Sequence, residues 1–155
     1  MDRPVRGSWY DFWIVLLLAG VGVGCGSSDT NNGRPMGEVT GKVTYQGKPV
    51  AGASIVFLPT TRDVPVGAAI TDQAGKYTLS ISGRKQGAVT GSYQVGISLS
   101  APYDGPVPAG MNPEYVKEQY PGKPLIPQKY FSAATSKLTA QVKLGHNSFD
   151  FSLQD

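Results

Sequence analysis

The chain has 155 residues, of which 40% are hydrophobic and only 16% are charged. This length suits one domain with a hydrophobic core, and 20 glycines and 12 prolines favour short strands and tight turns over a helical or disordered chain. The net charge of +3 is small and the basic residues are scattered, so the composition argues against a nucleic-acid partner.

The first 24 residues have the pattern of a bacterial export signal. Arg3 and Arg6 form a weakly positive start, residues 12–19 are an unbroken apolar run, and small residues lead up to Cys25. The apolar run is too short for a comfortable membrane-spanning helix. We therefore predict a signal peptide over residues 1–24 and an exported mature protein.

Cys25 is the single cysteine of the chain and the candidate for a lipid anchor. Its position after Gly24 resembles the lipobox of bacterial lipoproteins, in which the thiol accepts diacylglycerol and becomes the new N-terminus. Gly22 stands where that box usually has Leu. The resemblance implies a lipoprotein of the cell envelope, facing the periplasm or the cell surface, with the membrane as its partner through the lipid. A plain secretory signal and an uncleaved anchor are the alternatives.

A change of pattern at Glu38 marks the start of the folded domain. Residues 26–37 are rich in Gly, Ser and Asn, so we predict that the lipidated Cys and a flexible tether occupy residues 25–37. From Glu38 onward, apolar and polar residues alternate with period two, as in strands with one face on a core and one in water. We place the domain at residues 38–155.

Seven stretches of this domain are expected to form strands. They are residues 39–45, 54–58, 65–71, 76–81, 92–100, 138–144 and 149–153. Turn signals separate them at residues 46–49, 72–75, 83–91 and 145–147. The clearest is Asp72-Gln-Ala-Gly75, because Asp suits the first position of a turn and Gly the fourth. This spacing predicts an all-β fold, a seven-stranded Greek-key-type β-sandwich.

Residues 101–128 break the pattern, because they hold seven of the 12 prolines. Asn112 followed by Pro113 is a helix start, with Asn as the cap and Pro in the first turn, and it predicts one short helix that includes residues 115–120. Long loops in compact domains are often functional. The alternative is a Pro-stiffened connection that crosses from one sheet to the other.

Three segments resemble the motifs of carboxypeptidase regulatory-like domains. Gly41–Phe57 matches a Gly-x-Val strand followed by a Gly-x-Pro-Val-x-Gly-Ala turn, Thr71–Leu79 matches Thr-Asp-x-x-Gly-x-Tyr, and Gly91–Val95 matches a third motif. The C-terminal part is similar to that of small bacterial lipoproteins that carry this domain, over residues 126–130, 135–139 and 147–153. The resemblance implies a transthyretin-like (prealbumin-like) sandwich. It also implies an accessory module for folding, surface display or binding of carbohydrate or protein, without catalytic residues.

Side chains suited to catalysis are sparse. His146 is the single histidine and stands in a predicted Gly-His-Asn turn, and Cys25 is assigned to the lipid, so neither a thiol–imidazole pair nor a Cys/His metal cluster is expected. The carboxylates do not gather into a loop with dense oxygen ligands. We therefore expect no enzyme activity, no cofactor and no metal site.

Aromatic side chains in and beside the Pro-rich loop are the candidate contacts to a partner. They are Tyr103, Tyr115, Tyr120 and Tyr130. Tyrosine is favoured in protein interfaces, and aromatic rings suit the apolar faces of sugars. The alternative is that these rings pack the loop onto the sandwich.

These patterns together predict a non-catalytic, lipid-anchored cell-envelope protein. Its β-sandwich would act as a binding module for an envelope protein or a carbohydrate, because no residue pattern indicates a reaction. The alternative is a purely structural envelope lipoprotein that has no specific ligand.

Overall fold

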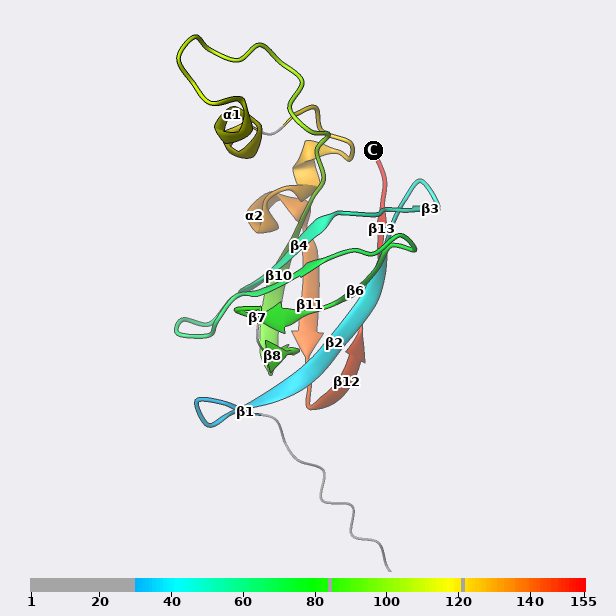
Figure 1. Ribbon diagram of the computed structural model, residues 1–155. Coiled ribbons are helices and arrows are strands. Elements are labelled where there is room, and N and C mark those ends of the chain that lie inside the picture. Colours follow the sequence, from blue (N-terminus) through cyan, green and yellow to red (C-terminus); the bar gives the residue numbers. More distant parts are fainter. Residues whose placement is uncertain (1–29, 84, 121) are drawn as a thin grey trace, which may run out of the picture.

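The computed structural model describes residues 30–83, 85–120 and 122–155. The predicted signal peptide and Cys25 lie outside these residues. The described chain is mostly β, and two sheets with thirteen strands form a sandwich with few helices (Figure 1). The prediction of an all-β sandwich is therefore confirmed.

The first sheet is organised by one long strand, β2 (Arg34–Tyr45), with which all its other strands pair. Four short strands pair antiparallel with it: β1 (Thr30–Asn31), β3 (Lys48–Pro49), β6 (Lys76–Thr78) and β9 (Ala88–Val89). Two pair parallel: β12 (Gly145–Ser148) and β13 (Phe151–Leu153). Thr40 pairs with both Thr78 and Ser148, so β6 and β12 lie on opposite edges of β2.

The second sheet is antiparallel and has the order β11-β10-β4-β5-β7-β8. These strands are β4 (Ser54–Pro59), β5 (Gly67–Ile70), β7 (Ser80–Ile81), β8 (Lys85–Gln86), β10 (Gly91–Ser98) and β11 (Leu138–Val142). Leu79 alone separates β6 from β7, which belong to different sheets. The stretch 76–81, predicted as one strand, therefore switches layers in its middle.

Several boundaries differ from the prediction. Strand β3 lies within the predicted turn at residues 46–49, and β8 and β9 lie within the predicted turn at residues 83–91. Residues 30–31 and 34–37 were placed in the tether, but they belong to β1 and β2, and Met36 is buried in β2. Residues 145–147 were predicted as a turn, but they belong to β12. The amide of Asn147 donates to the carbonyls of Glu38 in β2 and of Lys143, so its side chain satisfies backbone carbonyls while its own backbone pairs with β2. A turn-forming residue can thus stand in a strand.

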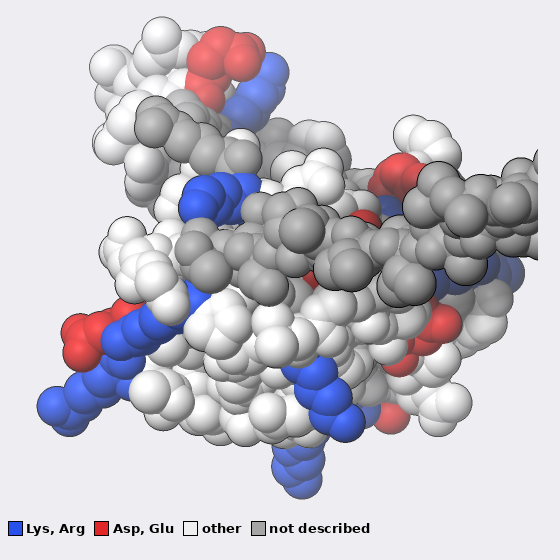
Figure 2. All heavy atoms as spheres, turned by 90° about the horizontal axis from the view of Figure 1, so that it is seen from below, with Lys and Arg blue, Asp and Glu red and all other residues white. Residues whose placement is uncertain are grey.

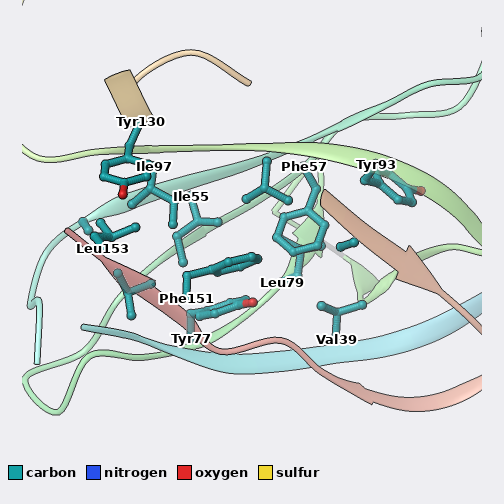
Figure 3. Close-up of a cluster of buried hydrophobic side chains, with 14 of the residues drawn as sticks. Val39, Ile55, Phe57, Tyr77, Leu79, Tyr93, Ile97, Tyr130, Phe151 and Leu153 are labelled. Atoms are coloured by element: carbon teal, nitrogen blue, oxygen red, sulfur yellow. The ribbon is translucent and has the colours of Figure 1, made fainter. Parts of the chain in front are cut away.

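The core lies between the sheets and is built from the inward positions of the alternating strands (Figure 3). Phe57 lies at its centre, with ring centroids 5.9–6.4 Å from those of four other aromatic residues: Tyr77, Tyr93, Phe149 and Phe151. Tyr77 stacks on Phe151 with an interplanar angle of 15°. Burial raises the pKa of Tyr77, whose hydroxyl donates to the carbonyl of Phe149 at 2.8 Å. The core is therefore packed by aromatic rings, and the buried hydroxyls of Tyr77 and Tyr93 both donate to backbone carbonyls.

Three short helices accompany the sheets in the described chain: α1 (Pro113–Gln119), η1 (Gln128–Tyr130) and α2 (Ala133–Ser136). The side chain of Asn112 accepts from the backbone N–H of Glu114, so the predicted cap of α1 is present. The segment from η1 to α2 packs against β10, where Gly96 leaves room for the backbone of Phe131 and Ala133. This segment carries Tyr130 into the core.

Candidate functional site

A loop leaves the sandwich at the end opposite to β1, and we call residues 102–122 the distal loop (Figure 1). Its two ends are paired: the N–H of Ala101 donates to the carbonyl of Lys123, and the N–H of Leu125 donates to that of Leu99, both at 2.9 Å. The distal loop contains α1 and projects beyond the sheets (Figure 1). Residues 99–101 and 123–125 therefore form a hydrogen-bonded stem, and the distal loop extends from it.

Two of the four candidate tyrosines are well exposed in the distal loop. Tyr115 on α1 is 54% exposed and Tyr120 is 48% exposed. Tyr103 is half-buried, with its ring centroid 5.9 Å from that of Tyr120 and its hydroxyl donating to the carbonyl of Pro106. Met111 adds a further exposed apolar side chain. The loop thus presents apolar and aromatic surface to solvent.

The fourth candidate, Tyr130, lies in the core instead. It is 8% exposed, and its hydroxyl exchanges hydrogen bonds with the backbone of Gln154, donating at 3.0 Å and accepting at 3.1 Å. This side chain is a structural element that fixes the end of the chain.

One capping side chain and one buried side chain hold α1 in place. Val116 is fully buried, although it belongs to neither of the two core clusters of the sandwich. Lys117 pairs with Glu114 at 3.1 Å, but both side chains are exposed, so this pair adds little stability. The orientation of Tyr115 therefore depends on the Asn112 cap and on the burial of Val116.

A second feature is a shallow depression of about 750 Å³ on the outer face of the first sheet. It was not predicted from the sequence. Its lining includes hydroxyl, ammonium and carboxylate groups from three neighbouring chain segments: Thr40, Lys42, Lys76, Thr78, Ser148 and Asp150. The polar positions of each strand are visible in the sequence, but their proximity depends on the parallel pairing of β12 with β2.

His146 lies next to this depression. Its Nδ1 is 3.3 Å from the carboxylate of Glu38, and its Nε2 is 3.4 Å from the hydroxyl of Thr40. The hydroxyl of Thr40, the imidazole of His146 and the carboxylate of Glu38 are thus connected in the same order as in the catalytic triad of serine hydrolases. However, the imidazole is 60% exposed and both distances are at the long limit of hydrogen bonds. We interpret these contacts as cross-strand pairing, since His146 stands opposite Glu38 in the register of β12 and β2.

Charged side chains of both signs are interspersed on the face seen in Figure 2. Among residues 30–155 without 84 and 121, no group of three or more His, Cys, Asp or Glu side chains is arranged to hold a metal ion. The helices of the described chain are all too short or too polar to cross a membrane.

The C-terminal residue is held by side chains of β2 and the turn that follows it. The carboxylate of Asp155 accepts from the hydroxyl of Tyr45 at 2.6 Å and from the amide of Gln46 at 2.7 Å. The hydrogen bond from Tyr45 is the main cause of a lowered pKa of Asp155, and it raises the pKa of Tyr45.

No family model and no curated protein matches the sequence. A solved structure that resembles the chain is that of a DUF3823 family protein from Parabacteroides merdae ATCC 43184, with 13% sequence identity and a TM-score of 0.40. The match covers 77% of this chain and 46% of the other, so the chain spans less than half the length of that protein.

Proposed function

We propose that this protein is a non-catalytic lipoprotein of the bacterial cell envelope whose β-sandwich presents the distal loop to a protein or glycan partner. The export pattern of residues 1–24 and the place of Cys25 after it support the anchor. More than one acyl chain is needed for stable membrane binding, as bacterial lipoproteins have.

The observation that carries the interaction role is the position of the distal loop. The first described strand, β1, lies within the stretch predicted as the tether and stands at the opposite end of the domain (Figure 1). An anchor attached at that end would leave the loop facing away from the membrane. Tyr115 and Tyr120 expose about half of their surface there, and tyrosine provides large contact area with few rotatable bonds.

We also propose a transthyretin-like fold of the carboxypeptidase regulatory-like type. Its first motif, Gly41–Phe57, forms the end of β2, a tight turn, β3 and most of β4. In its second motif, Oδ1 of Asp72 accepts from the N–H groups of Ala74 and Lys76, both at 2.8 Å. These contacts support the assignment of the motif as a turn that leads into β6.

The interaction role is tested with the full chain in bacterial envelopes and, purified in detergent, on a glycan array. Tyr115→Ser combined with Tyr120→Ser is compared with Leu144→Ser, which removes an apolar side chain that is 62% exposed outside the loop. We expect cross-linking or glycan binding to fall by about tenfold or more in the double variant and to persist in Leu144→Ser. Equal binding by all three proteins would refute the role of the loop, and no partner at all would favour a structural lipoprotein.

The anchor is tested separately by labelling cells with palmitate. We expect label and membrane retention in the wild-type protein and the loss of both in Cys25→Ser. Unchanged membrane retention of that variant would rule out lipid anchoring at Cys25.

A further inference from the structure

The depression on the first sheet has an ordered arrangement of polar groups. One row consists of hydroxyls, because Thr40 pairs with Thr78 on one side and with Ser148 on the other. The next row begins with Lys76 and Lys42, which stand opposite each other in the antiparallel register. Neighbouring strands are about 4.8 Å apart, so each row presents its side chains from backbone positions at a spacing comparable to the width of a sugar ring.

The positive charges of Lys42 and Lys76 repel each other across neighbouring strands. Like charges directly opposite each other on neighbouring strands are destabilising. Within the described part of the chain, neither the Lys42 nor the Lys76 ammonium forms an ion pair. Lys42 is half-buried and lines the depression together with Lys76. An acid group placed between the two ammoniums would remove the repulsion.

Two carboxylates define what kind of acid fits. Oδ1 of Asp150 accepts from the N–H of Lys42 at 2.8 Å, and Oδ1 of Asp72 accepts from two backbone N–H groups. Both residues line the depression, which makes the formal charge of its two lysines and two aspartates zero. A small inorganic anion would gain little there, because the carboxylates repel it. A ligand that carries hydroxyls beside its acid group can donate to these carboxylates instead.

We propose that this depression binds a carboxylated saccharide, such as a hexuronate oligomer. Its carboxylate lies between Lys42 and Lys76, and its hydroxyls meet the row that contains Thr40. Ile70 forms one wall and is 73% exposed, which provides an aliphatic surface for the C–H face of a sugar ring. This site is distinct from the distal loop.

The test measures binding of the detergent-solubilised full chain to three probes by calorimetry: a galacturonic acid oligomer, a galactose oligomer of the same length, and inorganic phosphate. We expect the acidic oligomer to bind at least about tenfold more tightly than the neutral one, because each ammonium contributes a charged hydrogen bond. We expect phosphate not to displace it. Equal binding of the neutral oligomer, displacement by phosphate, or no binding of the acidic oligomer would overturn the proposal.

Single variants locate the site. Lys42→Gln and Lys76→Gln are each expected to weaken binding of the acidic oligomer about tenfold. Lys143→Gln, an exposed lysine outside the depression, is expected to bind as the wild type does. Thermal unfolding of each variant verifies the fold. Unchanged affinity in Lys42→Gln and Lys76→Gln would overturn the proposal. The variant Tyr115→Ser/Tyr120→Ser should bind the oligomer normally, which separates this site from the proposed role of the loop.

Discussion

The hydroxyl of Tyr130 both donates to and accepts from the backbone of Gln154, at 3.0 and 3.1 Å. One side chain therefore ties η1 to the last residues of the chain. We expect Tyr130→Phe to lower the free energy of unfolding by about 1–2 kcal/mol, because two hydrogen bonds are lost while the ring is kept. Urea unfolding measures this. Tyr115→Phe on the exposed face of α1 is the control and should leave the midpoint unchanged, and an unchanged midpoint in Tyr130→Phe would contradict the structural role.

Gly41 of β2 lies against Phe149, which connects β12 to β13, and the close approach leaves no room for a side chain at position 41. A Cβ at this position would lie 1.9 Å from the carbonyl oxygen of Phe149, which is backbone and cannot move aside cheaply. We expect Gly41→Ala to destabilise the domain by about 2–3 kcal/mol or more, as overpacking does. Thermal unfolding of Gly41→Ala is compared with Thr44→Ala on the same strand. A loss no larger than in Thr44→Ala would show that the parallel strands can shift.

Asp72 organises the turn that leads into β6. Because its Oδ1 accepts two backbone hydrogen bonds, we expect Asp72→Ala to cost about 1–3 kcal/mol of stability and Asp72→Asn much less, since the amide oxygen still accepts. Denaturant midpoints of the two variants provide the measurement. Equal losses in both would indicate that the negative charge matters more than the acceptor.

These local features were predictable because their causes are local. The alternation in β2 and β10, the Asp72 turn and the Asn112 cap each depend on neighbours within a few residues. The parallel pairing of β12 with β2 joins residues such as Glu38 and His146 that are 108 positions apart, and no pattern in the sequence specifies that pairing. For the same reason the outer-face depression was not foreseen.

The candidate tyrosines show the same limit. All four stand in or beside the Pro-rich region, so no pattern in the sequence separates Tyr130 from Tyr115. The difference arises because the stem pairs at residues 99–101 and 123–125 and returns the chain to the sandwich before η1. Exposure of an aromatic residue in such a region depends on where the loop closes.

Acid should release the C-terminal residue. The pKa of Asp155 is lowered in the folded protein by hydrogen bonds from Tyr45 and Gln46. Its contribution to stability is therefore complete above the unfolded-state pKa of about 4 and is lost as the pH falls through the lower folded-state value. Below about pH 4, we expect the melting temperature of the wild type to fall more steeply with pH than that of Asp155→Asn. The difference should be small and best seen at low salt, because the groups are exposed. Identical acid slopes would contradict this, and Asp104→Asn in the distal loop is the matched control.

The distal loop should be removable without loss of the sandwich. Its stem is closed by backbone hydrogen bonds between residues 99–101 and 123–125, and its buried residue, Val116, is not part of either core cluster. We expect replacement of residues 103–121 by a short Gly-Ser linker to change the free energy of unfolding by about 1 kcal/mol or less. The shorter loop lowers the entropy cost of closure and offsets the lost packing of Val116. Urea unfolding followed by circular dichroism tests this, and loss of the cooperative transition would show that the loop is part of the fold. If the sandwich persists, the same protein separates the two proposed sites, because it should fail to bind a partner of the loop and still bind an acidic oligosaccharide at Lys42 and Lys76.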